Sequence, residues 1–88
     1  NNDSLKRLYM LESFRSYVLD VNNDINGKCC NFMTNIKIDK IIKELTSNYD
    51  LLKQNNGLFW GDELLSKKKL IEKYNNKKKL ARKYEIQK

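Results

Sequence analysis

Proline and histidine are both absent from this 88-residue chain, glycine occurs three times and cysteine twice. Without histidine the chain lacks the commonest general base, the commonest metal ligand and every dyad in which histidine activates serine or cysteine. Cys29 and Cys30 are adjacent, so a disulfide between them would close a strained ring and could not link distant loops. Two thiolates alone cannot complete a four-ligand zinc site within one chain. We therefore expect no enzymatic activity, no cofactor and no metal, with a thiol nucleophile or a vicinal-thiol switch at this pair as the alternative.

Long apolar runs are missing too, since the longest have three or four residues and a membrane span needs about 20. We expect no membrane partner. A chain of this length has room for one small core and not for a deep substrate cavity as well. We assign residues 4–84 to a single helical domain and residues 85–88 to a tail, and we expect a monomer.

Apolar residues recur at spacings of three and four over residues 3–21 and again over residues 36–45, which predicts two helices. The Asn, Asp and Gly residues at 22–27 predict a turn, followed by a linker to about residue 35 in which Phe32 and Met33 contact the core. Residues 46–48, Thr-Ser-Asn, are expected to break the second helix before one short helical turn at residues 49–52.

Asp62 is of a residue type that is favoured at helix N-caps, so it predicts the start of a long last helix. The apolar pattern of this helix weakens after residue 76, so we expect its end to project past the core. The apolar triplet at residues 58–60 lies between Gly57 and Gly61, which predicts that Phe59 and Trp60 fold back onto the junction of the first and third helices. The alternative is an exposed anchor for a partner. The predicted fold is all-α: a small three-helix bundle with a short extra helical turn and a long basic last helix.

Charge is distributed unevenly. Residues 1–66 hold eight Lys or Arg and nine Asp or Glu, whereas residues 67–88 hold ten and two, so the net charge of +7 arises from the last helix. Such a helix attracts acidic peptides, phosphopeptides or nucleic acid. The chain has 15 lysines and 12 asparagines, a composition typical of an AT-rich genome such as that of a malaria parasite, so a simple solvated helix is the alternative. The candidate partner-binding residues are Lys6, Arg7, Lys67, Lys68, Lys69, Lys73, Lys77, Lys78, Lys79, Arg82 and Lys83.

Three stretches of the chain share the pattern of a known family of small helical domains. Residues 11–18, Leu-Glu-Ser-Phe-Arg-Ser-Tyr-Val, are similar to the first helix of that family with its leading Phe14. Residues 36–52 are similar to the second helix and the turn that follows it. Residues 67–74, Lys-Lys-Lys-Leu-Ile-Glu-Lys-Tyr, are similar to the start of the third helix, with Ile71 where a second Phe is usual.

These three stretches resemble the FF domains of pre-mRNA splicing and transcription-elongation proteins. The resemblance implies a module of two helices, a 3₁₀ turn and a third helix that binds acidic or phosphorylated peptides, including those of the RNA polymerase II tail or of splicing factors. It also implies a nuclear location, with the cytoplasm as the alternative; reduced cysteines suit either compartment. Two other functions stay open. One is a nucleic-acid-binding domain that uses the same lysines on phosphates, although the last helix offers a single arginine, the main reader of base edges. The other is an interaction helix bundle specific to a parasite protein.

Overall fold

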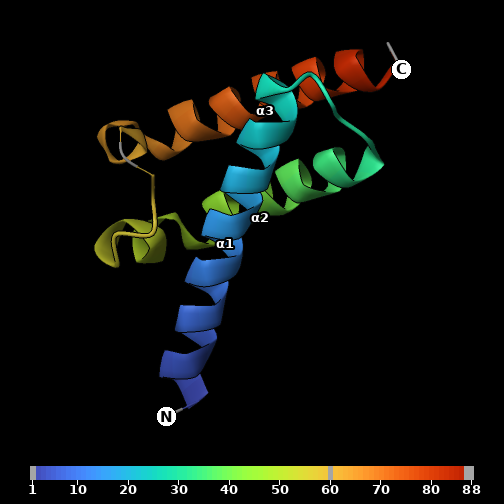
Figure 1. Ribbon diagram of the computed structural model, residues 1–88. Helices are drawn as coiled ribbons and strands as arrows, with labels where there is room; N and C mark the ends of the chain where they lie inside the picture. Colours follow the sequence, from blue (N-terminus) through green and yellow to red (C-terminus); the bar gives the residue numbers. More distant parts are fainter. Residues whose placement is uncertain (1, 60, 87–88) are drawn as a thin grey trace.

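The computed structural model describes residues 2–59 and 61–86. Over these residues the chain forms α1 (Asn2–Asn26), α2 (Phe32–Gln54), the 3₁₀ turn η1 (Asp62–Leu64) and α3 (Lys67–Ile86), with no strand among them (Figure 1). The prediction of a small all-α three-helix bundle with one short extra turn is confirmed. The extra turn, however, lies at Asp62–Leu64, whereas residues 49–52, where it was predicted, belong to α2.

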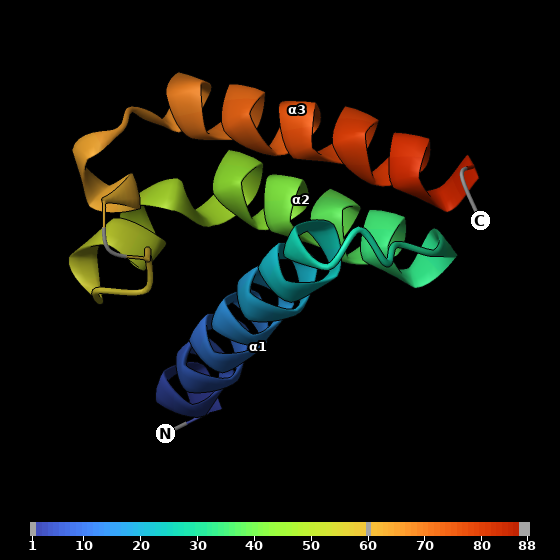
Figure 2. The ribbon, with the colours of Figure 1, turned by 45° about the horizontal axis from the view of Figure 1, so that its top comes forward.

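The helices α2 and α3 run side by side in opposite directions, and α1 crosses them at a steep angle (Figure 2). From Met10 onward α1 packs on the rest of the bundle, while its first turns project away from it. The core lies at the crossing and draws on all three helices and both connections. It consists of Phe14, Val18, Val21, Ile25, Cys30, Ile38, Ile41, Leu45, Leu52, Leu58, Leu70, Tyr74 and Ala81.

The first helix is longer than predicted, because the stretch taken for a turn continues the helix to Asn26. Val21 and Ile25 extend the buried face by one more turn, and their burial outweighs the turn preference of the neighbouring Asn and Asp residues. The helix ends where Lys28 adopts a positive φ of 51°. The amide of Cys29 then donates to the carbonyl of Asp24 at 2.9 Å and satisfies one of the last carbonyls of the helix.

The second helix begins four residues earlier than predicted, and the expectation that Phe32 and Met33 contact the core is wrong. Asn31 is the N-cap: its side chain accepts from the amide of Thr34, and the Thr34 hydroxyl accepts from the amide of Asn31. This capping box starts the helix at Phe32 and turns Thr34 inward, where its hydroxyl donates to Asp24 at 2.8 Å. Phe32 and Met33 are left 64% and 44% exposed.

The predicted break at residues 46–48 is only a kink. Asn48 leaves the helical region, with φ −133° and ψ 27°, but α2 continues to Gln54. The Asn48 amide donates to the Glu44 carboxylate at 2.9 Å, and the Thr46 hydroxyl donates to the carbonyl of Ile42 at 2.8 Å. Leu52 is fully buried beyond the kink, so packing holds the last turns of α2 to the core.

The connection from α2 to α3 folds back onto α1. A Cβ atom at Gly57 would clash with the end of the Leu11 side chain, so glycine lets the connection come this close to α1 without displacing that side chain. Leu58 is buried, and Phe59 packs half-buried on the core with the guanidinium of Arg15 4.8 Å from the centre of its ring. Phe59 therefore lies on the bundle, as predicted. Trp60, for which the same was predicted, lies outside the described residues.

Asp62 is not the N-cap of the last helix. It begins η1 and is buried, and α3 starts five residues later at Lys67. The hydroxyl of Ser66 accepts from the amide of Lys69 at 3.2 Å and takes the capping role. The carboxylate of Asp62 is thereby free to turn inward toward α3.

Candidate interaction surface on the last helix

Three lysines in the middle of α3 point toward the bundle and are used within it. Lys73 binds the Asp62 carboxylate at 2.6 Å, and Lys78 binds the Asp39 carboxylate of α2 at 2.6 Å. Lys77 donates to the side-chain oxygen of Asn22 of α1 at 3.0 Å. These three candidate partner-binding residues contact η1, α2 and α1, so their ammonium groups already have partners within the bundle.

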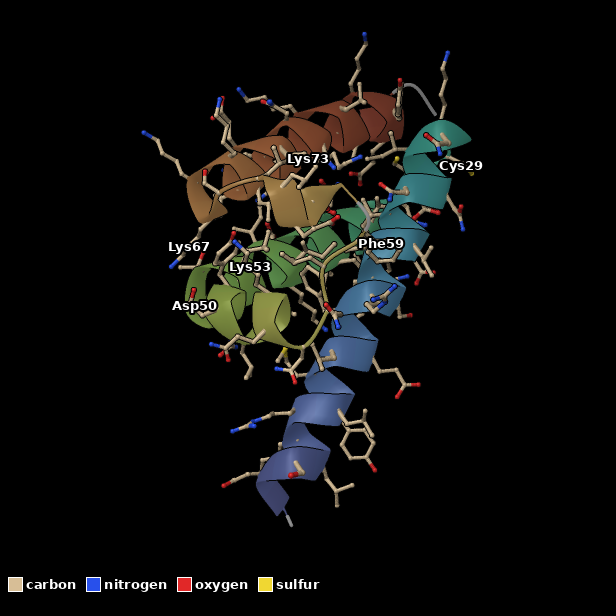
Figure 3. All side chains as sticks on the ribbon, turned by 90° about the vertical axis from the view of Figure 1, so that its left-hand side faces the viewer. Cys29, Asp50, Lys53, Phe59, Lys67 and Lys73 are labelled. Atoms are coloured by element: carbon tan, nitrogen blue, oxygen red, sulfur yellow. The ribbon has the colours of Figure 1, made fainter. Side chains whose placement is uncertain are left out.

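Asp62 anchors η1 to α3. Its carboxylate accepts from Lys73, and the hydroxyl of Tyr74 lies 3.4 Å from its other oxygen. Burial raises the pKa of the Tyr74 phenol, and the Asp62 carboxylate raises it further because a second negative charge there would be repelled. Tyr74 therefore stays neutral and donates a hydrogen bond. In the view of Figure 3, Lys73 lies on α3, above Phe59.

The sequence suggested that the second half of α3 projects past the core, but the structure shows it packed on the bundle. Ala81 is fully buried, and Asn35 of α2 donates to the Glu85 carboxylate at 2.8 Å. Lys77 lies so close to the bundle that burial lowers the pKa of its ammonium, and the neighbouring charge of Lys73 lowers it further. The weakened apolar pattern was misleading because lysine stems fill the places that larger apolar side chains would otherwise occupy.

The opposite face of α3 carries the lysines that remain exposed. A helix turns 100° per residue, so Lys68, Lys79 and Lys83 lie on one line that faces away from the buried Leu70, with Arg82 beside it. We call Lys68, Lys79, Arg82 and Lys83 the basic ridge. Glu72 lies on the same line, between Lys68 and Lys79. No ion pair joins the ridge to another described residue.

The remaining candidate partner-binding residues lie either beside the basic ridge or far from it. Lys67 and Lys69 are exposed in the first turn of α3, and Figure 3 shows Lys67 at the same end of the bundle as Lys53 and Asp50 of α2. Lys6 and Arg7 lie on the projecting first turns of α1, at the far end from α3 (Figure 1). The structure therefore does not bring these two residues to the basic ridge.

A shallow groove that the sequence did not reveal lies between α1 and α2. It is open, holds about 370 Å³, and is lined by Tyr9, Met10, Phe14 and Tyr17 together with Ser13, Lys40, Lys43 and Glu44. The ammonium of Lys40 lies 5.3 Å from the centre of the Tyr17 ring. The tyrosines could be read from the sequence only as helix-face packing residues, because the groove exists only where the two helices diverge.

Cys29 is exposed and Cys30 is buried, with no disulfide between them. Within residues 2–59 and 61–86, no group of acidic or cysteine side chains is arranged to hold a metal ion. None of the described helices has the length and apolar character that a membrane crossing requires. Comparison with protein-family models, curated proteins and solved structures finds no match for this chain.

Proposed function

We propose that this chain is a non-catalytic interaction module that binds an acidic or phosphorylated peptide along the basic ridge. The observation that carries the proposal is the division of the α3 lysines. Lys73, Lys77 and Lys78 are bound within the bundle, whereas Lys68, Lys79 and Lys83 face solvent on one line. Lys79 and Lys83 lie one helical turn apart and Lys68 lies about three turns before Lys79, so the row of cations can follow the repeated charge of an acidic segment.

The chemistry of the ridge favours carboxylates and phosphates as ligands. Lysine ammonium groups act as point charges, and Arg82 adds a planar fork that binds two oxygens of one phosphate or carboxylate. A phosphate group contributes about −1.5 to −2 charges near neutral pH, so phosphorylation should strengthen binding. The resemblance to FF domains supports a partner such as the RNA polymerase II tail or a splicing factor, and a nuclear location.

The test is a titration with an acidic phosphopeptide and its unphosphorylated counterpart at low and at near-physiological salt. We expect the phosphopeptide to bind more tightly and both affinities to fall as salt screens the ridge. The variant Lys79→Glu/Lys83→Glu should bind about tenfold more weakly or worse. The matched control is Lys6→Glu/Arg7→Glu, which makes the same charge change on α1 and should bind within about twofold of the parent.

Two results would contradict the proposal. One is no binding of either peptide at low salt, and the other is an equal loss of affinity in the ridge variant and in the α1 control. A single-stranded RNA of equal charge serves as the competitor. Tighter binding of that RNA, with a steep salt dependence, would favour the nucleic-acid alternative.

A further inference from the structure

A second face of α1, turned away from its core face, carries leucines that no other part of the described chain covers. Leu5, Leu8 and Leu19 are 51%, 59% and 51% exposed, and Tyr9 is also exposed. The first turns of α1 project from the bundle, and every residue from 3 to 9 is exposed (Figure 1). A helical extension of this length is marginal in water without tertiary packing, so a partner surface on this face would stabilise it.

The spacing on this face is that of a two-helix seam. Leu5, Leu8, Glu12, Arg15 and Leu19 follow one another at intervals of three, four, three and four residues. This is the heptad spacing at which one helix packs lengthwise against another. The core residues of α1 lie on a different side of the helix, so the seam and the core do not compete for the same residues.

We propose that this face pairs with the same face of a second copy of the chain, in an antiparallel two-fold dimer. When two identical helices run antiparallel, residues whose numbers share a constant sum lie opposite each other. The two-fold axis of this dimer passes between residues 13 and 14. Leu8 then lies opposite the second copy's Leu19, and Glu12 lies opposite its Arg15. The symmetry repeats both contacts, so the seam has apolar contacts toward its ends and two opposite-charge pairs in the middle.

Glu12 and Arg15 can both still form an ion pair with a second copy of the chain, given the contacts they make within their own. Glu12 is exposed and has no ion pair with another described residue. Arg15 uses one nitrogen to donate to the carbonyl of Asn56 at 2.8 Å and lies over Phe59. A guanidinium has five N–H donors, so its remaining edge can bind a carboxylate.

Charge also favours α1 over α3 as the self-association surface. The segment 2–26 holds Lys6, Arg7 and Arg15 against four acidic residues, whereas residues 67–88 hold ten basic and two acidic residues. Two α3 helices would repel each other, but two α1 helices would not. The dimer replaces the monomer expected from sequence, and its pairing through α1 leaves each basic ridge uncovered.

The experiment measures the dimer dissociation constant of the chain by sedimentation equilibrium, from about 1 µM to about 1 mM, with a reductant because Cys29 is exposed. Leu19→Glu should weaken the dimer at least about 100-fold, because it places a charge in an apolar contact. Leu64→Glu, the same change at an exposed leucine of η1, should leave it unchanged. Thermal unfolding confirms that each variant is folded.

A mixing experiment tests the register. Glu12→Lys alone sets Lys against Arg15 twice, and Arg15→Glu alone sets Glu against Glu12 twice, so each variant should dimerise about tenfold more weakly or worse. An equimolar mixture of the two variants restores two opposite-charge pairs and should dimerise like the parent chain. Glu72→Lys on α3 is the matched control for charge reversal and should have no effect.

Several outcomes would overturn the proposal. A chain that stays monomeric at about 1 mM has no such seam, and the face would then be left to a different protein. A dimer that withstands Leu19→Glu uses another surface. If Arg15→Glu destabilises the fold through the lost contact with Asn56, Glu12→Lys and Leu19→Glu still decide whether the seam exists. Folded single variants whose mixture stays monomeric would show that the register is wrong.

Discussion

The lysines on the two faces of α3 share one helix and one chemistry but have different environments. On the inner face, Lys73 and Lys78 each lie 2.6 Å from a carboxylate, and Lys77 is partly buried. On the outer face, Lys79 and Lys83 are exposed. A run of lysines is therefore not one binding site, because the direction of each side chain decides whether its charge is used within the fold or offered to a partner.

The inner face is itself uneven. The Asp62 side chain is 8% exposed where it meets Lys73, whereas the Asp39 side chain is 56% exposed where it meets Lys78. An ion pair with one buried partner is costly to break, since the remaining group loses both its partner and its water. A pair between exposed groups contributes little, because water screens both charges.

The largest expected effect comes from replacing Tyr74, the buried aromatic residue of α3. Tyr74 is buried between α3 and the rest of the core, so Tyr74→Ala should lower the free energy of unfolding by about 3–5 kcal/mol. Lys79→Ala, on the outer face of the same helix, should change it by no more than about 0.5 kcal/mol. Urea unfolding followed by circular dichroism measures both values. Equal destabilisation by the two variants would remove the distinction between the faces.

A smaller effect separates the two ion pairs. Asp62→Asn keeps the volume of the side chain but removes the charge that Lys73 binds, and it should lower the free energy of unfolding by about 1–3 kcal/mol. Asp39→Asn makes the same change at the exposed pair and should cost about 0–1 kcal/mol. The same unfolding experiment compares them, and a larger cost at Asp39 would contradict the anchoring role of Asp62.

The smallest expected effect is a pH dependence at alkaline pH. Tyrosine ordinarily loses its proton near pH 10.0, but burial and Asp62 raise the pKa of Tyr74 in the folded state. The folded chain therefore keeps a proton that the unfolded chain releases. Its contribution to stability is complete below that ordinary pKa and is lost as the pH rises through the higher folded pKa.

Tyr74→Phe isolates this contribution, because it keeps the ring and removes the titrating hydroxyl. Between about pH 10 and about pH 11, the free energy of unfolding should fall less steeply for the Phe variant than for the parent chain. All other ionisable groups are common to both chains, so their contributions cancel in the difference. Parallel pH profiles for the two proteins would mean that Tyr74 is not held neutral by its surroundings.

Much of the fold could be predicted from local pattern, and the errors share one cause. The periodic apolar residues predicted all three helices, but Asn and Asp near residue 24 and Thr-Ser-Asn at residues 46–48 were read as breaks. In each case a buried residue further along, Ile25 or Leu52, keeps the helix going. Local preferences of turn-forming residues amount to less than about 1 kcal/mol each, whereas burial of one large side chain contributes about 1.5–3 kcal/mol.

The candidate site was predicted less completely. The net charge pointed to α3, but the separation of Lys77 from Lys79 depends on which side of the helix meets α1 and α2. Lys6 and Arg7 joined the candidates only because they are basic, and α1 carries them away from α3. The groove beside Tyr9 and Tyr17 had no sequence signal, since it forms from residues of two helices about 30 positions apart.

The sequence by itself determined that this chain is helical, that it has no histidine, and that its positive charge belongs to the last helix. These are properties of residue type and spacing, which act locally. Only the tertiary structure decided that Asp62 turns inward to Lys73, that three lysines join the bundle and that the leucines on a second face of α1 stay exposed. Those outcomes depend on the angle at which α1 crosses α2 and α3, because that angle sets which side of each helix water can reach.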